Sequence, residues 1–248
     1  MVIINADDFG LNESCSKAIA LTFMRELVTD TTIMANGEYF DEAVKLAKER
    51  GFSDKIGVHL NITEGEPLSE GIKTLPDFVT NGLFNKSFSM ERELSETEKD
   101  AVYEELSAQV IKIENAGISI THADSHHYIH NAPFIAPIAE KVCKEHDIKK
   151  IRLQRNYGNM SDEDRTRARQ YYNMIRSKGF ITTEFFARLS EAENSDIPDS
   201  IEYLVHPDFN KSGELIDRHG TKDGFAFGSN IPDLKTEKNA VLGNYREL

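Results

Sequence analysis

Cysteine and long apolar runs are scarce in this sequence. The only cysteines are Cys15 and Cys143, and one possible pair cannot build a disulfide framework in a chain of this length. Both fall in helix-like segments, so we expect them to be buried thiols. No apolar run approaches the roughly 18 residues that a membrane span requires. The first residues, 1–8, do not resemble a signal peptide, and we therefore expect a cytoplasmic protein.

Positive charge is also in deficit. The 248 residues contain 29 Lys and Arg against 42 Asp and Glu, a formal net charge of −13, and no basic block occurs. Phosphate backbones and anionic lipid surfaces would be repelled. The balance therefore argues against nucleic acid or a membrane as the main partner and permits a neutral or cationic substrate. A hydrophobic content of 39% with 29% charged residues is typical of a globular protein with one substantial core.

Glycine-rich nucleotide motifs are absent, although the chain alternates strand-like and helix-like segments. Seven β-rich runs are predicted, at 2–6, 31–35, 55–62, 118–123, 150–154, 180–183 and 201–205, and a last strand is plausible at 240–245. Such alternation indicates an α/β fold with a parallel sheet. An open nucleotide-binding sheet would need a glycine-rich turn after its first strand. We therefore predict a single domain over 1–248, a (β/α) barrel of about seven parallel strands.

Helix signals and long loops complete this outline. Ser95 and Glu98 form a predicted capping box, with Gly117 as the stop of the same helix, and Ser161 is expected to cap a later helix. The segments 64–94 and 211–239 interrupt the alternation as long loop insertions. Loops of this length commonly form lids, binding loops or subunit contacts. We expect 64–94, with its three phenylalanines, to wall a pocket or to bury against a second subunit.

Aspartate and histidine residues gather where the predicted strands end. They are Asp7 and Asp8 after the first strand, His59 in the third, His122, Asp124, His126, His127 and His130 at the fourth, and His206 after the seventh. The carboxyl ends of parallel strands carry the active site in barrels of this kind. Residues distant in sequence are therefore predicted to converge on one pocket.

Each of these signals also has a structural interpretation. Asp7 and Asp8 could form an Asx turn before Gly10, and His59, between two apolar residues, could be a core histidine. Four histidines and one aspartate within 122–130 are harder to explain as solvated surface. One carboxylate with two imidazoles leaves coordination positions open for water and substrate, as a catalytic metal site requires.

Four motifs in order resemble the YdjC-like carbohydrate deacetylases. They are Asn5-Ala6-Asp7-Asp8-Phe9-Gly10, Gly57-Val58-His59-Leu60-Asn61, Thr121-His122-Ala123-Asp124-Ser125-His126-His127-Tyr128-Ile129-His130 and His206-Pro207. The resemblance extends over 2–245. It implies an irregular TIM-like barrel, one divalent metal usually given as magnesium, homodimers, and removal of acetyl groups from N-acetylated sugars such as chitooligosaccharides. It also implies that Asp8, His59 and His126 hold the metal.

Two departures from the family pattern concern sugar specificity. Tyr128 stands where many members have another histidine, and the segment 220–239 lacks the expected shape. Ligand chemistry alone would favour zinc, manganese, cobalt or ferrous iron over magnesium, because imidazole is a poor magnesium ligand.

A hydrolytic mechanism assigns roles to the remaining residues. A metal would polarise the acetamide carbonyl and lower the pKa of bound water. We expect Asp7 to take the water proton and His206, arriving from the far side of a barrel, to protonate the departing amine. Asp124 is expected to fix the tautomer of a ligand imidazole. Substrate contact or support of the metal ligands is expected of His122, His130 and Arg152.

Two other functional classes fit part of the pattern. His122, Asp124 and His206 match the facial triad of iron(II) oxygenases, with Arg218 as a conceivable 2-oxoglutarate anchor. Those enzymes need an antiparallel jelly roll, whereas this chain alternates strands and helices. A metal-containing sugar-binding protein without turnover would keep the histidines but has no use for the carboxylate of Asp7.

Overall fold

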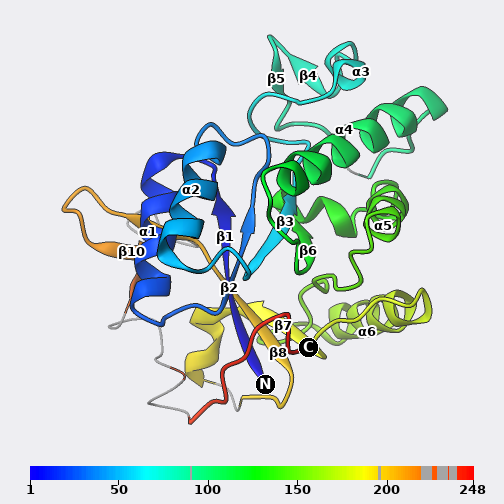
Figure 1. Cartoon of the computed structure of the whole chain (residues 1–248). Coiled ribbons are helices and arrows are strands. Elements are labelled where there is room, and N and C mark those ends of the chain that lie inside the picture. The colour runs from blue at the N-terminus through cyan, green and yellow to red at the C-terminus, as the bar shows by residue number, and fades with distance from the viewer. Residues whose placement is uncertain (90, 195–196, 219–224, 228–233, 235–238) are drawn as a thin grey trace.

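A parallel sheet that curls into a half-barrel forms the centre of the molecule (Figure 1). The computed structural model describes residues 1–248 apart from 90, 195–196, 219–224, 228–233 and 235–238. Its sheet has six strands in the order β6-β3-β2-β1-β8-β7, every neighbouring pair parallel. The bounds are β1 Val2–Phe9, β2 Asp30–Ile33, β3 Ile56–Leu60, β6 Ala123–Ser125, β7 Phe185–Arg188 and β8 Ile201–Val205.

The predicted seven-stranded barrel is not confirmed. The predicted strands 150–154 and 180–183 make only isolated parallel bridges, Ala123 with Ile151 and Lys150 with Ile181. The strand nearest to the predicted run 180–183 is β7, which begins only at Phe185. The predicted run 118–123 contributes only its last residue, Ala123, to β6. The terminal run 240–245 likewise makes one bridge, Leu242 with Val2. Apolar β-rich runs indicate burial, but they do not fix how many residues align in a ladder.

Helices cover the outer side of the sheet. The longer ones are α1 Glu13–Met24, α2 Phe40–Arg50, α4 Glu96–Asn115, α5 Ala136–Glu145 and α6 Asp162–Ser177. The capping box of Ser95 with Glu98 is confirmed, and Ser161 caps α6 by accepting from the amide of Asp164. Gly117 follows α4 with a φ of 76°, a left-handed conformation that glycine adopts without penalty.

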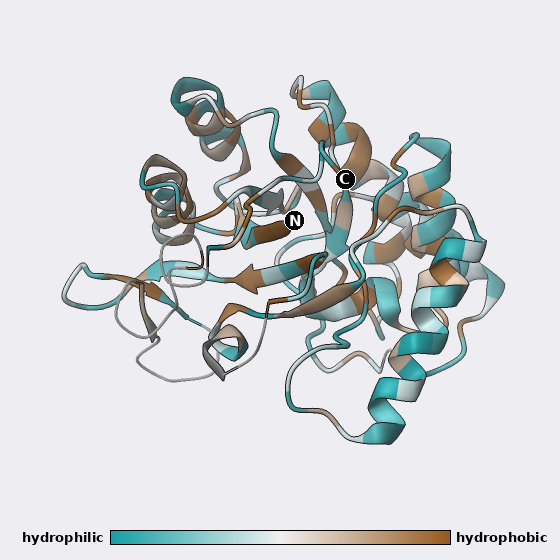
Figure 2. Cartoon of the chain, turned by 90° about the horizontal axis from the view of Figure 1, so that it is seen from below, coloured by the Kyte–Doolittle hydropathy of each residue, from teal (hydrophilic) through white to brown (hydrophobic). Residues whose placement is uncertain are grey.

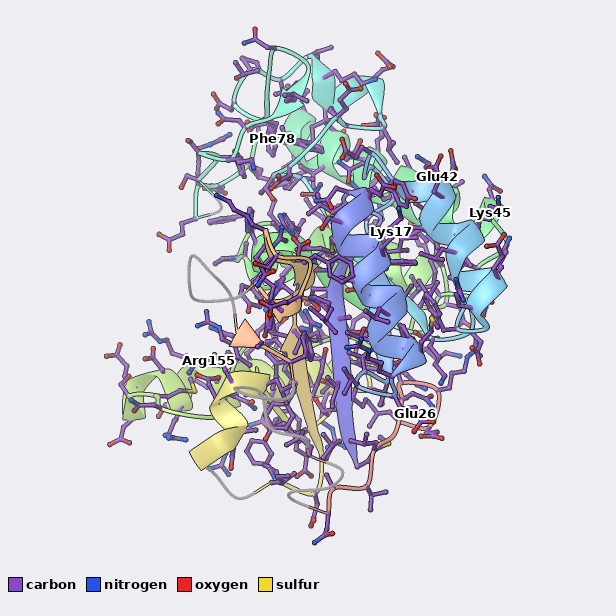
Figure 3. The ribbon with its side chains drawn as sticks, turned by 90° about the vertical axis from the view of Figure 1, so that its left-hand side faces the viewer. Lys17, Glu26, Glu42, Lys45, Phe78 and Arg155 are labelled. Atoms are coloured by element: carbon purple, nitrogen blue, oxygen red, sulfur yellow. The ribbon has the colours of Figure 1, made fainter. Side chains whose placement is uncertain are left out.

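Apolar side chains of sheet and helices share one core. In the ribbon of Figure 2 hydrophobic colouring is frequent in the central strands, and hydrophilic colouring is frequent on the outer helices. Glu42 and Lys45 lie on the outer face of α2 in Figure 3, whereas Ala43 and Ala47 of the same helix are buried. Both cysteines are free and buried, as the sequence predicts.

The segment 64–94 packs against α4 at the top of the view in Figure 1. It contains the short helix α3 Glu70–Lys73 and a hairpin of β4 Val79–Thr80 with β5 Leu83–Phe84. The rings of Phe78 and Phe88 stack at 4.1 Å between centroids, and Phe84 is also buried. All three phenylalanines belong to the same hydrophobic core as the sheet and the helices, and Figure 3 shows Phe78 within this segment.

A second small sheet follows β8. It consists of β9 Pro207–Phe209, β10 Leu215–Asp217 and β11 Phe225–Ala226 in antiparallel pairs. Much of the predicted loop 211–239, including most of 220–239, lies outside the described residues. Among the helices that are described, none combines the length and apolar character needed to cross a membrane.

Candidate metal centre

Asp7 and Asp8 lie at an irregularity near the end of β1. Successive residues of a strand normally point to opposite faces, but the register with β2 shifts between Ala6 and Phe9. Asp8 has a φ of 71°, a conformation that aspartate tolerates better than most residues. Both carboxylates consequently line one pocket, of about 300 Å³. The Asx-turn interpretation does not hold for Asp8, because its side chain faces histidines and not the following backbone.

Three predicted metal ligands converge in this pocket. Asp8 Oδ1 lies 3.2 Å from His59 Nε2 and 2.8 Å from His126 Nδ1. His59 comes from β3, and His126 begins the 3₁₀ helix η1, His126–Asn131, directly after β6. One ligand atom of each residue lies within 4.8 Å of the others. Tetrahedral zinc ligands at about 2.1 Å from the ion are about 3.4 Å apart, so the set fits a divalent metal in both spacing and donor chemistry.

Asp124 supports His59 from the side opposite Asp8. Asp124 Oδ1 lies 2.7 Å from His59 Nδ1, and the hydroxyl of Thr32 donates to Asp124 Oδ2 at 3.0 Å. Burial would lower the pKa of His59, but the charge of Asp124 raises it to about 10. A carboxylate on the far nitrogen orients an imidazole so that Nε2 faces the metal position. His59 is buried, but both of its nitrogens are engaged in this way, which does not match a histidine merely packed in the core.

Asp7 is held by a different partner, the guanidinium of Arg152. The two groups form a bidentate pair at 2.6 and 2.7 Å, and Asn5 donates to Asp7 Oδ1 at 2.8 Å. Burial opposes ionisation, but Arg152 holds the pKa of Asp7 well below its ordinary value. The two neighbouring aspartates therefore have different partners, two imidazoles and the partly exposed Arg218 for Asp8, and the fully buried Arg152 for Asp7.

Arg152 is fully buried and joins several carboxylates. Its guanidinium also lies 2.7 Å from Asp124 and 2.7 Å from Glu202. Glu202 in turn accepts a hydrogen bond of 2.5 Å from the hydroxyl of Tyr245. Arg152 thus connects the residue beside the metal position, Asp7, with the residue that orients His59.

His206 lines the same pocket as Asp7 and Asp8. Its backbone amide donates to Asp217 Oδ1 at 3.0 Å, which fixes the turn after β8. The sequence places His206 on the far side of a barrel, but this is wrong, because β8 pairs directly with β1. His206 therefore approaches the pocket from the strand next to Asp7.

His122 and His130 lie behind the pocket. The ring of His122 stacks on Tyr245 at 3.6 Å, and His130 Nδ1 lies 2.5 Å from the hydroxyl of Ser125. Burial lowers the pKa of both rings, to about 3 for His130. Neither residue lines the pocket or belongs to a potential metal group of the described chain. Their placement does not support a direct contact with metal or substrate.

The sequence analysis did not predict that two further charged residues, Glu64 and Arg218, contact the proposed metal ligands. Glu64 Oε2 lies 3.3 Å from His126 Nε2, and Arg218 Nη2 lies 3.0 Å from Asp8 Oδ2. Arg218 is expected from the sequence only as an anchor in the oxygenase alternative. Glu64 follows β3 by four residues, so its position after a strand end was the one available signal.

A larger groove adjoins the metal position. It has a volume of about 800 Å³ and shares Glu64 and Arg218 with the site. The part of 64–94 that faces it consists of Glu64, Gly65, Glu66, Pro67, Leu68, Leu83, Phe84 and Lys86. This segment therefore walls the groove next to the metal pocket, whereas the prediction was that it walls the pocket itself, and none of its described residues lines that pocket.

Comparisons with known proteins concern the chain as a whole. A family model described as YdjC-like protein matches residues 1–227. A protein of Listeria monocytogenes serotype 4b (strain CLIP80459), named carbohydrate deacetylase, is 33% identical over 217 residues, 84% of this chain and 81% of the relative. One of Clostridium beijerinckii with the same name is 29% identical over 258 residues, covering 100% and 99%.

A solved structure shares the fold. It is the crystal structure of a putative cellobiose-phosphate cleavage protein from Enterococcus faecalis V583, with a TM-score of 0.75. The match covers 99% of this chain and 97% of the other at 22% identity. At this identity the likeness concerns the fold alone.

Proposed function

The chain belongs to the YdjC-like protein family, and we propose on this premise that it is a metal-dependent carbohydrate deacetylase. The reaction is hydrolysis of the amide bond of an N-acetylated amino sugar or chitooligosaccharide. The observation that carries the proposal is the convergence of Asp8, His59 and His126 on one point, with Asp7 paired to Arg152 in the same pocket.

Asp8, His59 and His126 are the residues that would hold the metal. A divalent ion bound there supplies a Lewis acid for the acetamide carbonyl and lowers the pKa of a water molecule. One carboxylate and two imidazoles suit zinc, manganese, cobalt or ferrous iron, whereas the family resemblance points to magnesium. Asp124 holds the ring of His59 in position for this task.

Asp7 and His206 are the proposed proton-transfer pair. Asp7 is ionised, oriented by Arg152 and located in the pocket, so it can take a proton from the attacking water. His206 lines the same pocket and can deliver a proton to the departing amine nitrogen. Arg152 keeps the carboxylate of Asp7 aimed at the pocket throughout.

The groove beside the metal position is the proposed sugar-binding surface. Its volume of about 800 Å³ lies in the range of sites that enclose a ligand of several rings. The groove walls carry charge of both signs, from Glu64, Glu66, Lys86 and Arg218. We also propose a single catalytic domain over 1–248 that is located in the cytoplasm, and a homodimer, which the family resemblance implies.

The placement of two of its three ligands does not support the oxygenase alternative. His122 stacks on Tyr245 outside the pocket, and Asp124 is engaged by His59 and Arg152. The sheet is parallel, and a jelly roll is antiparallel. The sugar-binding alternative without turnover leaves the ionised Asp7 unexplained.

Acetate release from N-acetylglucosamine oligomers tests the proposal. We expect release by the purified protein, loss after treatment with a chelator, and recovery when a divalent metal is restored. Sugar binding without acetate release would favour the non-catalytic alternative. Release that resists the chelator and proceeds in metal-free protein would contradict metal dependence.

A further inference from the structure

A second group of metal-binding residues lies on the solvent side of His126. Glu64, His126 and His127 each offer one ligand atom, and these atoms lie within 4.8 Å of one another. His127 is exposed and Glu64 is half-buried, whereas Asp8 and His59 of the first group are buried. Since His127 lines the metal pocket and Glu64 lines the adjoining groove, this group stands where the two meet.

The two groups share His126 but use opposite edges of its ring. Nδ1 lies 2.8 Å from Asp8, and Nε2 lies 3.3 Å from Glu64 Oε2. The ring of His127 follows at 4.0 Å between centroids. The distance from Nε2 to Glu64 is already close to the roughly 3.4 Å between two ligands of one tetrahedral zinc ion. The ligand atom of His127 lies within 4.8 Å of the other two, and His127 Nδ1 also lies 3.0 Å from the hydroxyl of Thr63.

We propose that Glu64, His126 and His127 form a second divalent-cation site at the mouth of the pocket. One carboxylate and two imidazoles select zinc or cobalt and not magnesium. Binding through Nε2 of His126 displaces the proton of that nitrogen into solvent. With both ions bound, His126 would carry no ring proton and would be an imidazolate anion between them, and the second ion would stand in the path of any ligand that approaches the first.

Lys86 competes with a metal ion for the carboxylate of Glu64. Its ammonium lies 2.8 Å from Glu64 Oε1, with 64% of the lysine side chain exposed. A flexible, exposed ammonium is a weak partner for a carboxylate, so an ion can displace it. The same ion pair makes the second site weaker than the first.

Zinc binding to the full-length protein tests the proposal without any assay of activity. Equilibrium dialysis with Zn²⁺ should give two ions per chain, the second weaker. Glu64→Gln and His127→Phe should each weaken the second ion tenfold or more and retain the first. Asp8→Asn should lose the first ion and keep the second, which separates this site from the proposed catalytic one. His146→Ala, which removes an imidazole paired with Glu114 elsewhere, is the control and should change neither.

The variant Lys86→Met tests the second site in the opposite direction, by a gain in zinc affinity. Removal of the competing ammonium should tighten the second ion about three- to fivefold and leave the first unchanged. This gain in affinity is measured in a variant that keeps all three proposed ligands, so it does not result from a lost ligand or from a damaged fold. A single zinc ion per chain in the wild type, or two ions of unaltered affinity in Glu64→Gln, His127→Phe and Lys86→Met, would overturn the second site.

Discussion

Arg152 shows how much of the site depends on one side chain. Its guanidinium is fully buried and contacts the carboxylates of Asp7, Asp124 and Glu202. Three carboxylates surround this one cation, so negative charge is in excess. The pKa of Glu202 is raised, mainly because the carboxyl is buried and also because of the charge of Asp124. A buried ion pair contributes little over an apolar replacement of both partners, but loss of one partner leaves an uncompensated charge.

Arg152→Met is therefore expected to lower the free energy of unfolding by about 3 to 5 kcal/mol. The matched control is Arg155→Met, because Arg155 pairs with Glu191 at a site where both side chains are partly exposed. An exposed pair contributes about 1 kcal/mol or less. Urea unfolding of both variants measures the difference, and equal losses in the two would contradict the role given to Arg152.

Asp30 is a buried carboxyl away from the pocket. It accepts from the backbone amide of Tyr245 at 3.1 Å and from the hydroxyl of Thr29 at 2.9 Å. Burial raises its pKa from 3.8 to about 7 in spite of these hydrogen bonds. Between these two values the folded state binds more protons than the unfolded state, so stability falls as pH rises through this window and levels off above it.

Asp30→Asn should remove this pH dependence. We expect the wild type to lose about 2 to 3 kcal/mol more than the variant between about pH 5 and pH 8. The free energy of unfolding in urea, measured at both pH values, gives the comparison. Identical pH profiles for the two proteins would show that Asp30 keeps an ordinary pKa.

For helices and strands, sequence patterns predicted a feature correctly where the hydrogen-bond partners are only a few residues apart in the chain. The caps at Ser95 and Ser161 were predictable because each side chain bonds an amide three residues on. The strand 201–205 was also predicted with its observed bounds. The runs 150–154 and 180–183 failed as strands because a ladder depends on a distant neighbour, and each neighbour meets them at a single bridge.

The capping box of α4 gives a test at this scale. Ser95→Ala leaves the amide of Glu98 without its side-chain acceptor, so we expect a loss of about 1 kcal/mol in unfolding free energy. Ser95→Asp keeps an oxygen acceptor and should stay within a few tenths of the wild type. Thermal or urea unfolding of the pair decides, and an alanine variant as stable as the aspartate one would contradict the capping role.

For the whole molecule, the parallel sheet explains why the site could be anticipated. Its strands end at one edge, so Asp8 and His59 meet there although about fifty residues separate them. Glu64 could not be assigned from sequence in the same way, and Arg152 was expected only in general terms, as a substrate contact or a support of the metal ligands. Their roles depend on distances to His126 and Asp7 that only the curled sheet and the folded segment 64–94 create.

The central claim is that the adjacent aspartates divide two tasks, metal binding by Asp8 and proton transfer by Asp7. Metal content and acetate release, measured together on purified Asp7→Asn and Asp8→Asn, test it most directly. We expect Asp8→Asn to lose metal and activity together. Asp7→Asn should keep its metal and lose turnover by about 10² to 10⁴-fold, because an amide cannot take the water proton. Metal loss in Asp7→Asn with retention in Asp8→Asn would exchange the two roles, and full activity in both would contradict the account.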